Sequence, residues 1–286
     1  MEKTTQSNTS VWIIGGGKMG EAFLGGAFRY FSEIGREKDL LVIEPVDTIR
    51  DQLSCKYPVL TFPSVGNVLQ AGLFPEVIFF AVKPDRFPEL SEELLSLSSA
   101  SSAALAISVM AGVTLSQLER SLPDLRWVRT MSNLALTTGE GMTVIAPGSL
   151  ATISDERLVL ELFSRMGKAI CLPERDFDIA TAIAGSGPGF MALVGDALVD
   201  SGVLHGLKKE TASLLVAQMF VGTGTLLLSG SFPAELKGQV SSPGGTTIEG
   251  LASLESRAVR GAFIEAVSAA VKKSRLLGEG GAARRH

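Results

Sequence analysis

The stretch VWIIGGGKMG, residues 11–20, decides the fold. Four apolar residues predict a buried strand, and the glycines after them match the Gly-x-Gly-x-x-Gly turn that joins a strand to a helix. In such a turn Gly15 allows the sharp bend, Gly17 lets the backbone approach a pyrophosphate, and Gly20 lets the helix pack on the strand. The helix N-terminus adds unpaired N–H donors and a partial positive charge. We therefore expect a dinucleotide to be bound by Gly15, Gly17, Lys18, Met19 and Gly20.

Short apolar runs alternate with helical segments from Val11 to about Ile145, a pattern typical of βαβ units. It predicts an α/β fold with a Rossmann-type doubly wound parallel sheet that helices cover on both faces. The expected strands are residues 11–14, 40–44, 77–82, 104–109, 126–131 and 142–146. The expected helices are residues 19–31, 48–53, 87–97 and 114–120, the last with a capping box between Thr114 and Gln117.

After about Leu172 the β-branched runs give way to Ala, Leu, Gly and Ser at helical spacing, which predicts a second, all-α domain. Its small residues permit close helix approach, and such a domain can complete its core across a dimer interface. The expected helices are residues 176–184, 189–201, 208–229 and 246–277. We predict a dinucleotide-binding domain over 1–173, a helical substrate-binding and dimerisation domain over 174–278, and a flexible tail over 279–286.

Composition excludes several classes of function. The 286 residues carry a formal net charge of -4 with scattered Lys and Arg, which argues against a nucleic-acid partner. The two cysteines, Cys55 and Cys171, have no partner motif and are expected to be small core residues, and two histidines are too few for a His-rich metal site. No metal is expected.

The polar start of the chain, residues 1–10, lacks the apolar segment of a secretory signal, so a cytoplasmic protein is expected. Residues 211–234 carry no formal charge, and the stretch is long enough to raise the question of a membrane span. Their seven hydroxyl or amide side chains and the lack of aromatic belts favour a helix buried on all sides instead. No membrane association is expected.

Glu44 ends the second predicted strand, where an acidic residue normally accepts hydrogen bonds from the adenosine ribose. A carboxylate there would repel the 2′-phosphate of NADPH, although Arg50 lies close enough in sequence to compensate. The cofactor is therefore NADH or NADPH, with NADH the first to test.

Two further segments end predicted strands at the carboxyl edge of the sheet, where ligands bind in doubly wound folds. We expect both to line the cofactor site, with small residues that let the nicotinamide approach the backbone; core packing is the alternative for Met110. The residues concerned are Ala81, Val82, Lys83, Pro84, Met110, Ala111 and Gly112.

A Ser-Ser-Pro-Gly-Gly-Thr-Thr turn, residues 241–247, comes immediately before a predicted long helix. Consecutive N–H groups and hydroxyls at a helix N-terminus form a small nest that suits a carboxylate. An ordinary N-cap would need only one of these residues.

With these motifs the chain resembles the pyrroline-5-carboxylate reductase family, from about Val11 to Leu277. The resemblance rests, in order, on the glycine loop, on residues 81–84, 111–113 and 184–188, and on the 242–247 turn. It implies a cyclic imino acid substrate whose carboxylate binds to the turn, a homodimer through the helical domain and assembly of dimers in some members. The implied substrate residues are Ser242, Gly244, Gly245, Thr246 and Thr247, with Thr247 also catalytic beside the ring nitrogen, and Asn67 is implied on the adenosine side.

One loop departs from the family. Residues 131–135 read Met-Ser-Asn-Leu-Ala, which keeps the family's Asn133 and loses the Thr-Pro that usually follows it. The resemblance places this loop at the border of the active site, so a six-membered cyclic imine stays open as an alternative to the five-membered ring.

Two other classes of protein are alternatives. A hydroxyacid dehydrogenase of the 6-phosphogluconate type shares the two-domain plan but needs a lysine that residues 185–193 lack. In a non-catalytic dinucleotide-binding protein the 242–247 turn would be a structural cap and the altered loop at Asn133 would mark lost activity, but the intact turn argues against this alternative.

Overall fold

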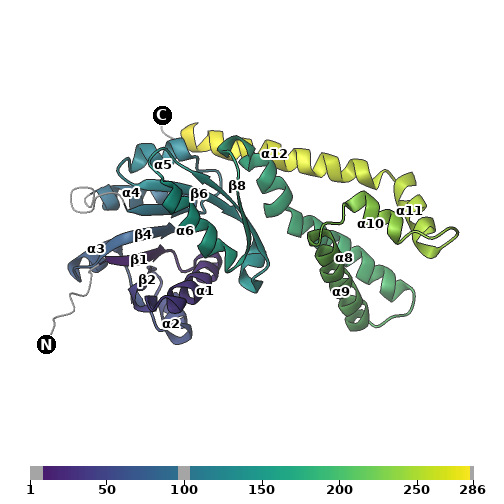
Figure 1. Ribbon diagram of the computed structural model, residues 1–286, viewed down its shortest axis with the longest axis horizontal. Coiled ribbons are helices and arrows are strands. Elements are labelled where there is room, and N and C mark those ends of the chain that lie inside the picture. Colours follow the sequence, from purple (N-terminus) through teal and green to yellow (C-terminus); the bar gives the residue numbers. More distant parts are fainter. Residues whose placement is uncertain (1–8, 96–103, 284–286) are drawn as a thin grey trace. The chain divides into compact units, whose positions relative to one another are not determined.

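The computed structural model describes residues 9–95 and 104–283. Eight strands form one sheet in the order β3-β2-β1-β4-β5-β6-β7-β8, in which β1 lies between β2 and β4 (Figure 1). The strands are β1 (Thr9–Ile14), β2 (Leu40–Ile43), β3 (Leu60–Phe62), β4 (Phe74–Phe80), β5 (Leu105–Ser108), β6 (Arg126–Ser132), β7 (Gly141–Pro147) and β8 (Gly167–Cys171).

Strands β1 to β6 are parallel, as predicted, but β7 runs antiparallel to β6. The predicted Rossmann-type sheet is therefore present, and it departs from parallel pairing between β6 and β7. Only residues 133–140 join β6 to β7, and a parallel crossover needs about a dozen residues or more. The two strands missed by the sequence, β3 and β8, are short or partly exposed and lack a long apolar run.

Helices cover both faces of the sheet. Alternate side chains of β1 enter two separate cores: Trp12 and Ile14 pack with α3, α4 and α5, whereas Val11 and Ile13 pack with α1, α2 and α6. The helices of this part are α1 (Lys18–Glu33), α2 (Asp47–Lys56), α3 (Val65–Gln70), α4 (Phe87–Leu95), α5 (Leu115–Ser121), α6 (Ile153–Ser164) and α7 (Phe177–Ala180). Short 3-10 or π turns are η1 (Glu37–Asp39), η2 (Pro84–Arg86), η3 (Leu134–Thr138), η4 (Glu174–Asp176) and η5 (Thr181–Gly185).

The predicted Thr114–Gln117 capping box is present at the start of α5. Helices α3 and α6 were not predicted, and the predicted helix 87–97 is α4 up to Leu95, with its last two residues outside the described part of the chain.

The C-terminal part is helical, as predicted. Close packing of α8 on α9 depends on small residues, because a Cβ at Gly195 would lie 3.1 Å from the Phe220 ring and one at Gly202 would lie 2.9 Å from Ala212 Cβ. The predicted helix 246–277 is in fact two helices, since Ala258 takes a positive φ of 53° between them. The helices are α8 (Gly187–Leu204), α9 (Lys209–Leu228), α10 (Pro233–Gln239), α11 (Thr246–Ser256) and α12 (Val259–Ala283).

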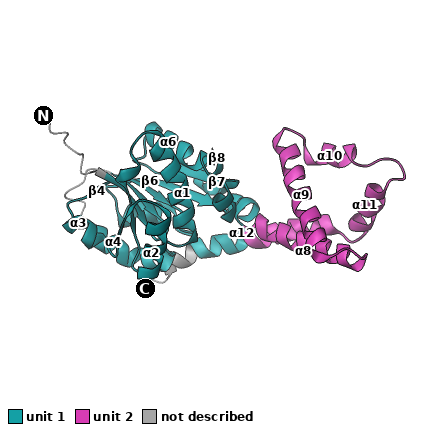
Figure 2. Cartoon of the chain, turned by 90° about the horizontal axis from the view of Figure 1, so that it is seen from below, with its two compact units in different colours: residues 1–185, 271–286 teal, residues 186–270 magenta. Residues whose placement is uncertain are grey.

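The chain divides into two compact units, residues 1–185 together with 271–286, and residues 186–270 (Figure 2). The proposed boundary at 173/174 thus differs from this division, which leaves α7 and η5 with the first unit. The predicted flexible tail also differs: α12 stays helical through Ala283, and residues 284–286 lie outside the described part. Helix α12 contributes to both units.

Apolar side chains are widely exposed on α8 and α9 in the single chain. Of α9 only Ala212 is buried, so the expectation of a helix buried on all sides is wrong for the isolated chain. Two helical stretches, Glu174–Leu204 and Lys209–Leu228, are long and apolar enough to cross a membrane by length and composition alone, a test that core helices of soluble proteins also pass. The exposure of α9 instead fits a helix that needs a partner surface.

Both cysteines are exposed, which corrects the expectation that they belong to the core. Cys55 lies on α2 and Cys171 ends the edge strand β8, and both elements have a solvated side. Their sequence neighbourhoods carried no signal for this, because Cys is compatible with either environment.

Candidate active site

The glycine loop has the close contacts that its spacing predicts. Gly15 has a φ of +102°, and a Cβ on it would lie 2.6 Å from the carbonyl oxygen of Ala81. A Cβ on Gly20 would lie 1.8 Å from the carbonyl oxygen of Gly15. Both positions therefore require glycine, which lets β1, α1 and the end of β4 meet.

Gly17 differs from these two glycines, because a Cβ there would meet nothing within 4 Å. It is the N-cap of α1, in an extended conformation, and has no side chain that could accept a hydrogen bond from the first N–H groups of the helix. Those donors and the open space above Gly17 suit the pyrophosphate of a dinucleotide. Lys18 and Met19 form the first turn of α1, and Lys18 is exposed.

Glu44 lies at the end of β2 and is only 7% exposed. One carboxylate oxygen accepts a hydrogen bond from the Gly16 N–H at 2.7 Å, and the other accepts one from the Val46 N–H at 3.0 Å. Arg50 donates to the Glu44 carbonyl oxygen at 2.6 Å and forms an ion pair with Asp47. Glu44 thus ties the glycine loop to the second strand while its remaining lone pairs can still accept.

Gly16 is a residue that the sequence reasoning missed. A Cβ on Gly16 would lie 2.9 Å from both Ile49 Cγ2 and Leu53 Cδ1, so glycine lets α2 pack beside the loop. The signal was the middle glycine of the Gly15–Gly17 triplet, which the Gly-x-Gly-x-x-Gly pattern leaves unassigned.

Asn67 belongs to α3, where its side-chain oxygen accepts a hydrogen bond from Ser64 Oγ at 2.8 Å. Ser64 is also the N-cap that accepts from the Asn67 N–H. This region lies beside Glu44, since the Glu44 N–H donates to the Phe62 carbonyl at the end of β3. The position is compatible with a role on the adenosine side.

The segment after β4 lies at the same edge of the sheet as the glycine loop. The Ala81 N–H donates to the Ile14 carbonyl at 2.8 Å, and the Val109 N–H, after β5, donates to the Phe80 carbonyl at 3.2 Å. Lys83 is extended, and Pro84 starts the turn η2. The structure therefore brings the ends of β1, β2, β4 and β5 together, with Ala81–Pro84 among them.

Met110 is 2% exposed and packs in the core that also contains Trp127. Its N–H donates to Ser108 Oγ at 3.3 Å. The core-packing alternative therefore applies to its side chain, and only the backbone of residues 110–112 is open to a cofactor role. Gly112 has a φ of +74° and packs against Leu277.

The Asn133 side chain holds two segments together. Its Nδ2 donates to the Ala184 carbonyl at 3.0 Å, and its Oδ1 accepts from the Met142 N–H at 3.3 Å. A Cβ on Gly185 would lie 2.7 Å from Met131 Cε, so the π turn η5 packs closely on this loop. The observed contacts of Asn133 thus position backbone.

The predicted carboxylate nest belongs to the other compact unit. Residues 242–245 form a turn in which the Gly245 N–H donates to the Ser242 carbonyl at 3.0 Å, and Gly244 has a φ of +64°. Gly245 is the N-cap of α11, and a Cβ on it would lie 2.3 Å from Ser242 Oγ. Thr246 and Thr247 open the helix, so their N–H groups have no intrahelical acceptor.

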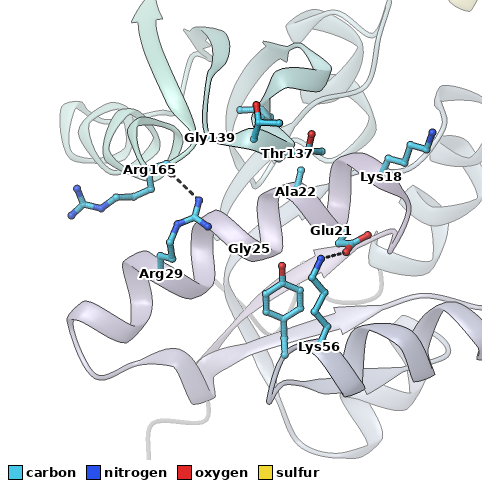
Figure 3. Close-up of a pocket in the computed structure, with 12 residues that line it drawn as sticks. Lys18, Glu21, Ala22, Gly25, Arg29, Lys56, Thr137, Gly139 and Arg165 are labelled. Carbon is cyan, nitrogen blue, oxygen red and sulfur yellow. Dashed lines mark hydrogen bonds and ion pairs between the residues drawn. The ribbon is translucent and has the colours of Figure 1, made fainter. Parts of the chain in front are cut away.

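A cavity of about 480 Å³ is lined by α1, by the end of α2 and by η3 (Figure 3). It shares only Lys18 with the expected cofactor residues. Its other cations have partners: Lys56 pairs with Glu21 at 2.6 Å, Arg29 donates to the Arg165 carbonyl at 2.9 Å, and the Arg165 side chain pairs with Glu33. In the described residues no group of three or more His, Cys, Asp or Glu could hold a metal ion.

The strand, glycine turn and helix, joined to a separate helical unit, define a dinucleotide-dependent oxidoreductase. Residues 10–112 match the family model described as NADP oxidoreductase coenzyme F420-dependent, and residues 174–277 match that for pyrroline-5-carboxylate reductase dimerisation.

Individual relatives agree. The chain is 38% identical to a pyrroline-5-carboxylate reductase of Synechocystis sp., covering 93% of this chain and 97% of the relative, and 36% identical to that of Methanosarcina acetivorans, covering 95% and 99%. A solved pyrroline-5-carboxylate reductase from Coxiella burnetii superposes with a TM-score of 0.84 at 29% identity, covering 95% of this chain and 99% of that one. The chain belongs to the pyrroline-5-carboxylate reductase family and is an NAD(P)H-dependent oxidoreductase.

The dimerisation domain accounts for the apolar exposure of α8 and α9. A homodimer through residues 174–277 supplies the partner surface that these helices lack in the single chain. The prediction of a homodimer is thereby supported.

Proposed function

We propose that this enzyme reduces the C=N bond of 1-pyrroline-5-carboxylate with NADH or NADPH, giving L-proline. The observation that carries the proposal is the Ser242–Thr247 turn, which places unpaired N–H donors at the N-terminus of an eleven-residue helix in a chain of this family. No capping side chain competes for these donors at Gly245. A small carboxylate fits such a terminus by charge and by hydrogen bonding.

Each residue of the turn has a role in the proposal. Ser242 Oγ and the N–H groups of Thr246 and Thr247 bind the carboxylate. Gly244, with its positive φ, and Gly245, whose N–H donates to the Ser242 carbonyl, give the turn its shape. Thr247, the second residue of α11, orients the ring nitrogen through its hydroxyl. These residues hold the substrate and leave bond making to the two reactants.

A reduced nicotinamide, when bound at the glycine loop, would supply the hydride that the imine carbon accepts. The ring nitrogen must carry a proton for the imine to accept hydride well, and a pyrroline nitrogen is basic enough to take that proton from solution. The chain therefore needs no dedicated acid, which agrees with its two histidines. Holding both reactants in contact accounts for much of the rate enhancement.

For the cofactor, we propose that NADH is preferred. The Glu44 carboxylate lies at the end of β2, and the Arg50 guanidinium is already engaged by Asp47 and by the Glu44 carbonyl. A 2′-phosphate there would face a buried negative charge with no uncommitted cation from Arg50.

A six-membered cyclic imine is the second candidate, and the loop after Asn133 favours testing it. Leu134 and Ala135 stand where the family usually has Thr and Pro, and Leu134 is 57% exposed. An apolar side chain in that loop could line a wider pocket. We also propose a cytoplasmic location. A measurement of molar mass would show whether dimers assemble into larger oligomers.

Initial rates test the proposal. Oxidation of NADH and NADPH is followed optically with five- and six-membered cyclic imino acids, using the wild type, Thr247→Ala and Ser256→Ala. Ser256 is the matched control because it lies at the other end of α11, where its hydroxyl donates to the Ser253 carbonyl at 2.8 Å. We expect Thr247→Ala to lower kcat by about 10- to 100-fold, the size of one hydrogen bond to a charged group. No oxidation by the wild type with any pair of cofactor and imine would overturn the proposed activity.

A further inference from the structure

The last turns of α12 pack on the loop that follows β5. A Cβ on Gly112 would lie 3.1 Å from Leu277 Cβ and 3.2 to 3.3 Å from the Leu277 carbonyl group, so the loop backbone touches the helix directly. Gln117 Nε2 donates to the Gly278 carbonyl at 3.3 Å while its Oε1 accepts from Thr114 in the capping box. Figure 2 colours this end of α12 with the dinucleotide-binding unit.

Asp178, on α7, fixes this end of α12 from a second direction. Its Oδ1 accepts a hydrogen bond from Ser274 Oγ at 2.6 Å, and its Oδ2 lies 3.7 Å from Arg275 Nε. Ser274 and Arg275 lie one helical turn or less before Leu277, so Asp178 sets the height at which Leu277 meets Gly112.

The same loop is held from its other side by Glu174. A carboxylate oxygen of Glu174 accepts from the Leu115 N–H at 2.7 Å and from Arg129 at 2.7 Å. Residues 110–114 are therefore held at two places. Glu174 binds the start of α5, and the end of α12, which Asp178 holds, packs on Gly112.

We propose that Asp178 and Ser274 are positioning residues for cofactor binding: through Leu277 they hold the Met110–Gly112 backbone in the conformation that binds the nicotinamide. The inference rests on the proposed function, because it takes residues 110–112 as part of the cofactor site. Met110 cannot position the loop alone. Its side chain anchors one end in the core, and the flexible Gly112 follows it.

The contact between Gly112 and α12 also makes the loop more rigid. Gly112 adopts a left-handed conformation that few other residues take, so the loop has little stiffness of its own at this point. Packing against α12 replaces that missing stiffness. Because α12 begins at Val259, in the helical unit, the same helix carries both a contact to the cofactor loop and part of the substrate-binding unit.

The test compares two serines of α12. Ser274→Ala removes the hydrogen bond to Asp178, whereas Ser268→Ala, the control, removes one that goes only to the Ile264 carbonyl of the same helix. We expect Ser274→Ala to raise the dissociation constant of the reduced cofactor about threefold to tenfold, the usual net size of one protein hydrogen bond. The KM for the imino acid at saturating cofactor should stay within about twofold of the wild type.

Asp178 provides the rescue experiment. Asp178→Asn keeps an acceptor for Ser274 and should bind cofactor nearly as well as the wild type, whereas Asp178→Ala should match Ser274→Ala. Binding is measured by titration of cofactor fluorescence without imine, and thermal midpoints show whether each variant is folded. Equal dissociation constants for Ser274→Ala and Ser268→Ala would overturn the positioning role and leave the proposed activity intact. A wild type that binds neither NADH nor NADPH would overturn both.

Discussion

The backbone N–H of Gly16 donates to the Glu44 carboxylate at 2.7 Å, joining the glycine loop to the end of β2 in a buried setting. The second oxygen accepts from Val46, so one side chain satisfies backbone donors from two loops. An acid at this position therefore has a structural use as well as an expected role toward the ribose. The two uses can be separated by experiment because they depend on different properties of Glu44, its hydrogen-bond acceptors and its charge.

Glu44→Gln removes the charge and keeps one acceptor. We expect the preference for NADH over NADPH, as a ratio of kcat/KM values, to fall about tenfold, because the 2′-phosphate no longer faces a carboxylate. The amide NH₂ would face a backbone N–H, which costs about 1 to 3 kcal/mol of unfolding free energy. Asp51→Asn is the control, since it removes the same charge from an exposed position of α2. An unchanged ratio in Glu44→Gln would show that this carboxylate does not select the cofactor.

Gly17→Ala and Gly20→Ala separate cofactor binding from folding. A methyl group on Gly17 meets open space, so its unfolding free energy should change by less than about 1 kcal/mol while cofactor affinity falls at least tenfold, because the methyl occupies the place of the pyrophosphate. A methyl group on Gly20 would lie 1.8 Å from the Gly15 carbonyl and should destabilise the fold by about 3 kcal/mol or more. Urea unfolding and cofactor titration measure the two effects. Normal affinity in Gly17→Ala would place the pyrophosphate elsewhere.

The glycine loop shows why part of the fold could be predicted from the sequence. Strand β1 and helix α1 carry local signals, an apolar run, three spaced glycines and an amphipathic period, and each signal is complete within a short window. Edge strand β8 carries no such signal: Gly167 enters it with a φ of 140°, and its pairing with β7 is a long-range property. The reversal of β7 was also invisible locally, since it follows from the length of the connection after β6.

For the candidate site, residues whose role is conformational were predictable and those held by distant partners were not. Gly15 and Gly244 have the positive φ that their turns require. By contrast, the contacts of Asp178 with Ser274, and of Gly112 with Leu277, join positions separated by more than ninety residues, and single-sequence patterns do not report such pairs. The exposure of Leu214 on α9 was likewise unpredictable, because the sequence does not say which chain buries an apolar helix.

Leu215→Glu tests the dimer interface. Leu215 is 58% exposed in the single chain, and we expect a homodimer through the helical domain to bury it against the partner. A buried leucine contributes about 2 kcal/mol, and the two-fold symmetry of a dimer counts it twice, so the dissociation constant of the dimer should rise at least about 100-fold. Light scattering after gel filtration gives the molar mass. Thr211→Glu, which adds the same charge in the first turn of α9, should stay dimeric. A dimer in both variants would place the interface on other residues.

Cys171 provides a prediction about pH. Cys171 is exposed as a residue, but its thiol is partly buried at the end of β8. This burial, together with the hydrogen bond and negative charge of Glu156, raises the pKa of Cys171 to about 12. Only the thiolate reacts with iodoacetamide, so about one molecule in 10⁴ is reactive at pH 8. In a Cys55→Ser background, where Cys171 is the remaining thiol, we expect the alkylation rate to rise about tenfold per pH unit through pH 10.

A substitution of Glu156 tests its part in raising the pKa of Cys171. Glu156→Gln removes the charge beside the thiol and should lower the pKa of Cys171, so alkylation at pH 8 becomes faster. Glu161→Gln is the control on the same helix, since its carboxylate accepts from the Tyr30 hydroxyl at 3.2 Å instead. Because burial is the larger cause, the pKa in Glu156→Gln should stay above the usual value of a cysteine. A rate that levels off below pH 10 in the parent protein would mean that the thiol is fully solvated, and equal rates in the two glutamine variants would remove Glu156 from the explanation.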